Sequence, residues 1–295
     1  MDALTLMSWN VRYFGHGTRG LRSTRGWMRK VASALGSRES LPDVIALQEV
    51  ETSSLRGGLR GKPQLDRFQA MLHEIVGSTD HYRGVHFPSH RYAVGGTSLY
   101  TQGLAVLLGP GVELEHHDVH DITHVRLSAF ERVKQRRIAA HLRLRVRGAA
   151  PIDLFNTHLS LPAFFEVGLH RIADRMGFGS NQLHEASTLR SIVEDVSNGR
   201  AIVVGDFNSM PGSPVYDHLC GASLRDAYAE SHGLSLAELL EQATAGFFHK
   251  RMHIDHVFSS PGVHWLDFED HSYDRKGPFA GLSDHAPKVG RFSLR

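Results

Sequence analysis

Short apolar runs in this chain end at polar residues that can hold a divalent metal ion or a phosphate group, and this feature limits the possible folds most strongly. After the run Ala201–Val204, Asp206 and Asn208 stand two residues apart, on the same side of an extended chain. In a layered α/β protein such strand ends meet in one crevice, so the sequence predicts a single assembled site. The residues at the run ends are Asn10, Glu49, His158, Asp206 with Asn208, and Asp284 with His285.

The length and composition favour one folded domain. The chain has 295 residues, of which 41% are hydrophobic, and no linker or low-complexity segment divides it, so we expect a single domain over residues 1–295. No apolar stretch approaches the roughly 20 residues needed to cross a bilayer, and the first residues lack a secretory pattern. A cytoplasmic protein is therefore expected. The single cysteine, Cys220, excludes an intramolecular disulfide and is expected to be a small buried hydrophobe.

Hydrophobic periodicity predicts strands and helices that alternate along the chain. Helical spacing occurs in residues 27–35, 65–76 and 181–197, and strands are expected at 4–9, 44–47, 103–108, 137–146, 152–157, 201–204 and 288–294. Arginines alternate with aliphatic residues in 138–147, which is typical of a strand with one solvated face. Because similar strand-end residues occur twice, at Asn10 and Glu49 and again at His158 and Asp206, we expect a pseudo-symmetric pair of packed sheets.

The histidines at 116, 120 and 124 form a possible alternative metal site. On a helix, His116, His120 and His124 would share one face and could bind zinc. The glycines and proline at 109–111 and the β-branched residues nearby favour strand and loop instead. We therefore do not predict a zinc site there.

Two basic stretches have two possible interpretations. The net charge is only +2, but Val11 to Arg38 contains seven arginines and lysines and no acidic residue, and Arg56 to Lys62 is also basic. These residues either present positive charge to an anionic substrate or form ordinary solvated faces. The segment 162–179, which contains Phe164 and Phe165, is either a loop that covers the substrate or, as we favour, a packed surface helix.

The donor atoms at the strand ends favour Mg²⁺ or Mn²⁺ over zinc. Glu49 and Asp284 are the natural carboxylate ligands, and Asn10 adds a neutral oxygen donor. A histidine can hydrogen-bond a phosphoryl oxygen or protonate a leaving group, and a carboxylate can orient water. Together these residues are suited to the hydrolysis of a phosphate ester.

Six segments in order along the chain resemble the endonuclease/exonuclease/phosphatase superfamily, which has the deoxyribonuclease-I-like fold. The resemblance extends over almost the whole chain and implies a four-layered α/β sandwich, with two mixed β-sheets face to face and helices outside. It also implies a metal-dependent phosphoesterase. The segments are Met7–Val11 (MSWNV), Ile45–Val50 (IALQEV), Asn156–Leu159 (NTHL), Val204–Asn208 (VGDFN), Ile254–Phe258 (IDHVF) and Leu282–Pro287 (LSDHAP).

The resemblance also implies roles for the residues around the metal. Glu49 matches the principal metal ligand, with Asn10 and Asp284 close to the ion. His285 matches the histidine that contacts the scissile phosphate, and Asp255 matches the aspartate that orients its imidazole. The neighbouring His256 is expected to face outward.

The remaining matched residues act on water and phosphate in the family. Asp206 and Asn208 match the pair that positions the attacking water and the phosphate. His158 matches a histidine of the deoxyribonuclease and sphingomyelinase branches, where abasic-site endonucleases generally have a tyrosine. Abasic-site repair is therefore a less favoured function.

The sequence leaves the substrate open, because one fold can act on many phosphoesters. The basic stretches favour a phosphodiester, such as a nucleic acid, cleaved by in-line attack of water. A phosphatase or a phospholipase-C-type hydrolase acting on a lipid or small molecule is the alternative. A non-catalytic binding protein with this fold is a third hypothesis, against which the complete set of metal and histidine residues argues.

Overall fold

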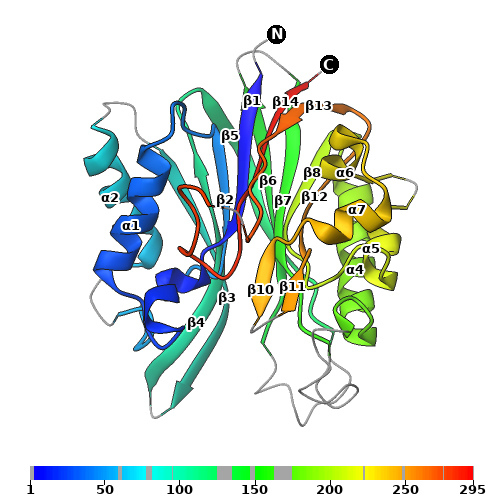
Figure 1. The fold of residues 1–295 in the computed structure, drawn as a ribbon. Helices are drawn as coiled ribbons and strands as arrows, with labels where there is room; N and C mark the ends of the chain where they lie inside the picture. Colours follow the sequence, from blue (N-terminus) through cyan, green and yellow to red (C-terminus); the bar gives the residue numbers. More distant parts are fainter. Residues whose placement is uncertain are drawn as a thin grey trace.

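The computed structural model describes residues 3–58, 62–77, 82–94, 96–124, 135–146, 150–162, 175–221, 223–247, 250–274 and 276–294. Two six-stranded mixed sheets lie face to face, and helices cover the outer face of each (Figure 1). The predicted four-layered α/β sandwich is confirmed. The segment with Phe164 and Phe165, and Arg60 of the second basic stretch, lie outside the described residues.

The first sheet has the order β13-β14-β1-β2-β4-β3, and the second has the order β5-β6-β7-β8-β12-β9. The strands of the first sheet are β1 (Leu4–Asn10), β2 (Val44–Gln48), β3 (Arg83–Val94), β4 (Thr97–Leu108), β13 (Val263–Phe268) and β14 (Lys288–Leu294). Those of the second are β5 (Val112–Asp121), β6 (Ile138–Val146), β7 (Ile152–His158), β8 (Ala201–Asp206), β9 (Arg225–Asp226) and β12 (Asp255–Ser259). A separate hairpin consists of β10 (Ala245–Phe247) and β11 (Lys250–Met252).

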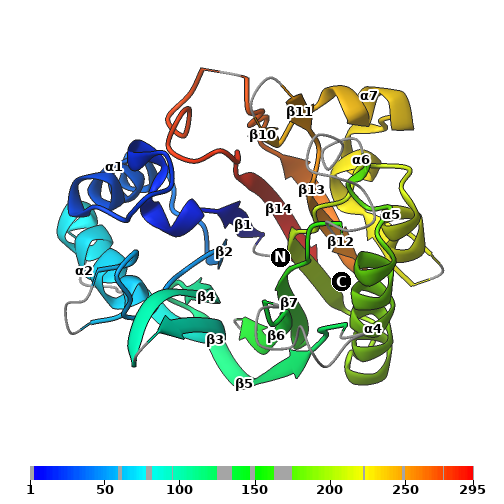
Figure 2. The same ribbon diagram turned by 90° about the horizontal axis from the view of Figure 1, so that it is seen from below.

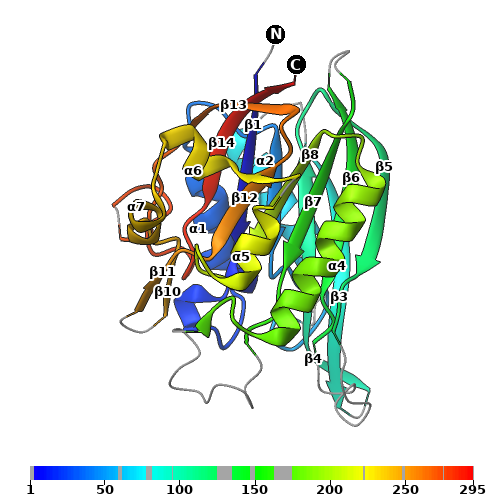
Figure 3. The same cartoon turned by 90° about the vertical axis from the view of Figure 1, so that its right-hand side faces the viewer.

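Helices form the two outer layers. Helices α1 (Arg25–Gly36) and α2 (Gln64–Val76) cover the first sheet (Figure 2). The helices on the second sheet are α4 (Ser180–Val196), α5 (Pro214–Leu219), α6 (Ala227–His232) and α7 (Leu236–Glu241). Figure 3 shows α4 and α5 lying across the outer face of that sheet. No helix in the described ranges is long and apolar enough to cross a membrane.

Both sheets have the same plan. A parallel pair, β1 with β2 in the first sheet and β7 with β8 in the second, is flanked on each side by two antiparallel strands. This arrangement fits the expected pseudo-symmetry. Because the strands of a parallel pair end at the same edge, the last residues of four strands approach one another across the space between the sheets.

The alternation of side chains along β1 decides which residues face the site. Leu4 and Leu6 join the core between the two sheets, whereas Met7 and Trp9 join the core beneath α1 and α2. Successive side chains of a strand point to opposite faces, so Asn10 shares the inner face with Leu6. The apolar alternation therefore turns the Asn10 amide toward the second sheet.

The predicted elements lie close to the observed ones, and the differences have physical causes. The three predicted helices correspond to α1, α2 and α4 within two residues at each end. β3 was not predicted because most of its side chains are exposed or half-buried, so it lacks a clear apolar period. His116 and His120 lie in the extended strand β5, and His124 follows that strand, so the helical zinc face is absent.

Cys220 has the packing role expected of it. It follows α5 and is half-buried against the core of the second sheet. Burial, with a smaller contribution from Asp226, raises the pKa of the Cys220 thiol to about 12. The thiol therefore stays protonated at neutral pH and is not a nucleophile.

Candidate active site

The strand ends meet as the sequence predicts. Asn10 pairs with Gln48, the residue before Glu49, in the first sheet, and His158 pairs with Asp206 in the second. Antiparallel pairing also sets Asp255, the first residue of β12, directly opposite Asp206. Three neighbouring strands of the second sheet thus bring their polar residues to one edge.

Asn10 joins the two sheets at this edge. Its Nδ2 atom donates to Oδ2 of Asp206 at 3.0 Å and to Oε1 of Glu49 at 3.4 Å. Asn10 and Asp206 are 1% and 2% exposed, so this link between sheets is protected from water. Hydrogen bonds to carboxylates in such surroundings hold the two acids in fixed positions.

The backbone at the site is strained. Glu49 and Asn208 have φ values of 58° and 48°, in the left-handed region that non-glycine residues rarely occupy. Gly205 has a φ of 150°, and a Cβ atom there would lie 2.0 Å from the Thr157 carbonyl oxygen. Only glycine fits this position, and it allows β8 to end with Asp206 facing the crevice. The Asn208 backbone N–H then donates to Oδ1 of Asp206 at 3.0 Å, and its side-chain amide donates to the Leu159 carbonyl at 2.9 Å.

Two histidines approach the same oxygen of Asp206. Nε2 of His158 lies 3.4 Å and Nε2 of His285 lies 3.6 Å from Oδ2 of Asp206. Nδ1 of His285 lies 2.9 and 3.0 Å from the two carboxylate oxygens of Asp255. The Asp255 carboxylate therefore fixes the ring so that Nε2 points into the site.

The segment that carries His285 is held from both sides. The Trp9 indole N–H donates to the His285 carbonyl at 2.9 Å, and the Ala286 N–H donates to the Thr244 carbonyl at 2.7 Å. The Thr244 hydroxyl oxygen also accepts from the backbone N–H of Asp255 at 3.1 Å. One threonine thus connects the two segments that bring His285 and Asp255 together.

The two histidines have opposite protonation tendencies. Burial lowers the pKa of His158 well below its ordinary value, and the charges of Arg137 and His285 lower it further. Burial alone would also lower the pKa of His285, but the charges of Asp255 and Asp206 outweigh it and raise that pKa well above the ordinary value. The surroundings therefore favour the neutral form of His158 and the protonated form of His285. Burial, and then the charge of Asp255, raises the pKa of Asp206 to about 7 even though His285 opposes the shift.

Asp284 lies at the opening of the site. Its Oδ2 atom is 3.0 Å from the Arg12 guanidinium, and its Oδ1 lies 3.3 Å from the Ser283 hydroxyl oxygen. That hydroxyl donates to the Asn10 carbonyl at 2.7 Å. Asp284 and Asn10 are therefore attached to one another through Ser283.

These residues fit a divalent cation. Burial raises the pKa of Glu49, and the nearby charge of Asp284 raises it further, although the charges of His285 and Arg56 oppose the shift, so two carboxylates lie close together here. In the described part of the chain, no cationic side chain pairs with Glu49 within 4.0 Å. Oxygen donors from two carboxylates and an amide are what Mg²⁺ and Mn²⁺ prefer. Glu49, Asn10 and Asp284 are therefore candidate ligands for such an ion, and the Oδ1 atom of Asn10 also accepts from the backbone N–H of Arg12 at 3.0 Å.

Arg137 is a further residue of the site that was not predicted from the sequence. Its side chain is buried behind His158, where its guanidinium donates to the His158 carbonyl and to the Ser160 hydroxyl, both at 3.3 Å. Arg137 also lines a pocket that includes Glu49 and His158. The sequence pattern places Arg137 at the start of a predicted strand, and this position does not indicate a contact with the segment that contains His158.

One expectation needs correction. His256 points away from the crevice, but it is 1% exposed and packs beneath the helices instead of facing outward. Arg56 of the second basic stretch pairs with buried Glu51 and lies over the Tyr13 ring at 3.9 Å, and its charge lowers the pKa of Glu49. Most other basic residues of 11–38 are exposed, and of that stretch Arg12 is the one that forms an ion pair with a predicted site residue in the described structure.

Comparison with known proteins identifies the family. The model of the Endonuclease/Exonuclease/phosphatase family matches residues 7–285. The chain belongs to this family. A search of curated protein sequences finds no significant match.

Solved structures of the family share its fold at low sequence identity. The human Nocturnin catalytic domain with bound sulfate has a TM-score of 0.62 and 19% identity, and the alignment covers 99% of this chain and 94% of that one. ANGEL2, a 2',3'-cyclic phosphatase in complex with adenosine-2',3'-vanadate, has a TM-score of 0.66 and 15% identity over 99% and 96% of the two chains. A mannosyl-6-phosphatase of Bacteroides thetaiotaomicron has a TM-score of 0.63 and 16% identity over 99% and 100%. The family and its fold assign this chain to the phosphoester hydrolases.

Proposed function

We propose that this family member is a Mg²⁺- or Mn²⁺-dependent phosphodiesterase of the nuclease type, which cleaves its substrate by in-line attack of water. The observation that carries the proposal is the meeting of two histidines of opposite protonation tendency on one oxygen of Asp206. Titratable groups whose pKa values are pushed apart within one site are typical of acid–base catalysis.

Each residue then has a defined task. Glu49, Asn10 and Asp284 would hold the ion, whose charge polarises the phosphoryl oxygens when it is bound. Asp206 accepts a proton from the attacking water, since a carboxylate with a pKa of about 7 is suited to a general base at neutral pH. Asn208 fixes Asp206 through its backbone N–H. Protonated His285, oriented by Asp255, and neutral His158 donate hydrogen bonds to the phosphoryl oxygens, where charge increases in the transition state.

A diester is favoured because the site continues on two sides. One pocket beside Glu49 and His158 is lined by Gln102, Arg136 and Arg137. A second pocket beside His285 is lined by Tyr273, Lys276 and Phe279, among others. A phosphate with a substituent on each side would contact both of these lined surfaces, whereas a monoester would contact one. The basic and aromatic side chains are suited to a nucleic acid or another nucleotide-containing diester.

The names of the structural neighbours keep one alternative open. One structural neighbour is named a mannosyl-6-phosphatase, so a small-molecule phosphatase is the second candidate. In that case one of the two pockets would hold the sugar and the other would be unused.

A hydrolysis panel tests the proposal. Purified protein is assayed with Mg²⁺, with Mn²⁺ and with a chelator on single-stranded DNA, plasmid DNA, RNA, sphingomyelin, inositol phosphates, mannose 6-phosphate and a simple diester. We expect metal-dependent cleavage, fastest on a nucleic acid. His285→Ala protein serves as the control for contaminating nucleases. Faster turnover of monoesters than of every diester would replace the proposal with the phosphatase alternative.

A further inference from the structure

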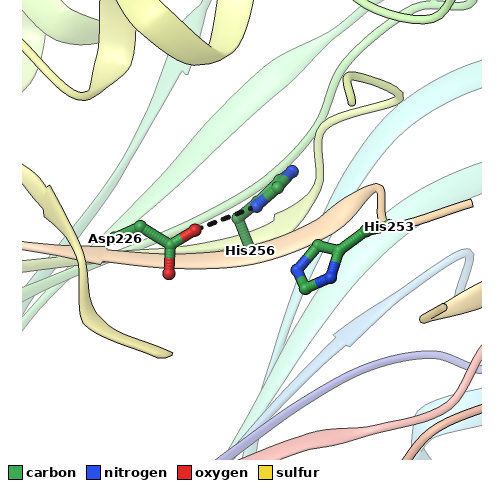
Figure 4. A group of neighbouring side chains, drawn as sticks. All are labelled: Asp226, His253 and His256. Atoms are coloured by element: carbon green, nitrogen blue, oxygen red, sulfur yellow. Dashed lines mark hydrogen bonds and ion pairs between the residues drawn. The ribbon is translucent and has the colours of Figure 1, made fainter. Parts of the chain in front are cut away.

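Strand β12 has a second cluster of ionisable side chains on the face turned away from the active site. Asp226 ends β9, His256 lies in β12, and His253 lies just before β12. Figure 4 shows Asp226 and His256 in contact, with the His253 ring beside them. One potential ligand atom from each residue lies within 4.8 Å of the other two. Sequence patterns did not predict this cluster, because Asp226 precedes His253 by 27 positions and His256 by 30.

The cluster is closed to solvent, and one member lacks well-formed hydrogen bonds within the described part of the chain. Asp226, His253 and His256 are 6%, 0% and 1% exposed. No described residue forms a hydrogen bond of normal geometry with either ring nitrogen of His253, although the backbone carbonyls of Leu239 and Gln242 lie close enough to oppose the fall in its pKa that burial causes. A buried polar group without a hydrogen-bond partner lowers the free energy of unfolding by about 1–3 kcal/mol. A bound ligand that contacts the imidazole would remove part of this loss.

The hydrogen bonds of His256 leave its Nδ1 atom facing the Asp226 carboxylate without a proton between them. Its Nε2 lies 2.8 Å from the Ser209 carbonyl oxygen, and only an N–H can donate there. In a neutral ring Nδ1 is then a lone pair, and it faces Oδ2 of Asp226 at 3.3 Å. Two electron-rich atoms at this distance attract a cation between them, either a proton on the ring or a metal ion. A proton would satisfy His256 but would leave His253 without a partner.

We propose that Asp226, His253 and His256 supply three of the four ligands of a buried structural Zn²⁺ site. Two ligand atoms on a tetrahedral zinc ion with bonds of about 2.0–2.1 Å stand about 3.3 Å apart, as the Asp226 and His256 atoms do. Two imidazoles and one carboxylate favour zinc over Mg²⁺, which prefers oxygen ligands and bound water. Because the ligands are buried, substrate cannot reach the ion.

Surrounding groups hold the ligands in place. The Tyr216 hydroxyl donates to Oδ2 of Asp226 at 3.2 Å, and Oδ1 accepts from the backbone N–H groups of Tyr228 and Ala229 at the start of α6. Such outer contacts orient metal ligands in known sites. Buried Lys288 lies over the Tyr228 ring, and burial lowers its pKa to about 8.

The ion would fasten α6 and the end of β11 to the strand that positions Asp255. Asp226 caps α6, and Asp255 and His256 are neighbours on opposite faces of β12. This role is structural and separate from phosphoester hydrolysis. Loss of zinc should therefore affect unfolding more than the chemistry of the folded enzyme.

The metal content of the protein tests the proposal. Untagged Glu49→Gln protein, in which the proposed active-site ligand is altered, is stripped with a chelator, exposed to Zn²⁺, dialysed and analysed by mass spectrometry. About one zinc ion per chain is expected, as for a closed structural site. Cobalt in place of zinc should give the intense visible bands of tetrahedral coordination, and zinc should raise the melting temperature of the stripped protein.

A pair of variants locates the ion. In the same background, His253→Leu should abolish zinc retention, whereas His141→Leu, which changes a buried histidine paired with Asp153, should retain it. If His253→Leu does not fold, the cobalt spectrum and the zinc-dependent melting of the parent protein decide the question. No retained zinc in the folded parent, equal retention in His253→Leu, or an octahedral cobalt spectrum would each overturn the proposal.

Discussion

The two faces of β12 carry the same kinds of side chain in different surroundings. On the crevice face, Asp255 pairs with His285, whose other nitrogen points toward Asp206 and the opening of the site. On the helix face, Asp226 faces His256, and His253 is fully buried. Access to substrate, and not residue type, distinguishes the two clusters.

This difference shows how one strand can serve chemistry and stability together. The crevice cluster keeps a protonated histidine at an accessible position, which suits the stabilisation of developing charge. The helix-face cluster has no route for substrate and can contribute only to folding. Substitutions on the two faces should therefore separate into effects on kcat and effects on the free energy of unfolding.

The largest effect is expected on the crevice face. His285→Ala should lower kcat by about 100-fold or more, as expected for loss of a positioned group that contacts the phosphate. Asp255→Asn should lower kcat as well, because it weakens the contact that orients the ring. Steady-state kinetics of both variants, with circular dichroism to confirm folding, measures these losses.

The double variant sharpens this prediction. If Asp255 acts through His285, the double variant should be little worse than His285→Ala alone, since residues that act as a unit are not additive. Losses that multiply in full, with every variant folded, would show that Asp255 does not orient His285.

The matched change on the helix face is His256→Leu. It removes the bond to Ser209 and the contact with Asp226, so it should lower the free energy of unfolding by about 1–3 kcal/mol. The kcat of the folded fraction should stay within about threefold of wild type. Urea denaturation measures the free energy of unfolding, and steady-state kinetics measures kcat. A large fall in kcat in fully folded protein would contradict the proposed separation of the two faces.

A buried bridge between the sheets should show a similar loss of stability without a role in chemistry. Asn156 accepts from Nε2 of Gln48 at 2.8 Å and donates to the carbonyls of Leu47 and Ala105. Asn156→Ala should lower the free energy of unfolding by about 2 kcal/mol, because it leaves buried polar groups without hydrogen-bond partners. Urea denaturation checks the loss, and an unchanged midpoint would mean that the bridge contributes nothing net.

The smallest effect is expected at the rim. Arg12→Gln should raise KM for a nucleic acid and reduce the slope of log KM against log salt by about one, as expected for the loss of a phosphate contact. Arg25→Gln changes an exposed arginine of the same basic stretch and should leave the slope unchanged. Equal slopes for Arg12→Gln and wild type would assign Arg12 to its ion pair with Asp284 alone.

Sequence patterns predicted what depends on strand ends and missed what depends on packing between distant segments. Asn10, Glu49, His158 and Asp206 follow apolar runs, so their convergence was predictable from the layered fold. The buried position of Arg137 and the strained φ of Glu49 arise only when the sheets pack. His256 was expected to face outward because alternation shows that it leaves the crevice but does not show which helices cover it.

The most direct test of the account is a Mg²⁺ titration of Glu49→Gln. The substitution keeps the shape of the side chain and removes the charge proposed to hold the ion. Hydrolysis of the best substrate from the panel is measured against Mg²⁺ concentration, with circular dichroism as the control for folding. The account predicts that the folded variant loses activity at limiting Mg²⁺ and needs at least about tenfold more of the ion than wild type, as expected for the loss of a charged ligand. Normal activity at limiting Mg²⁺ would contradict it.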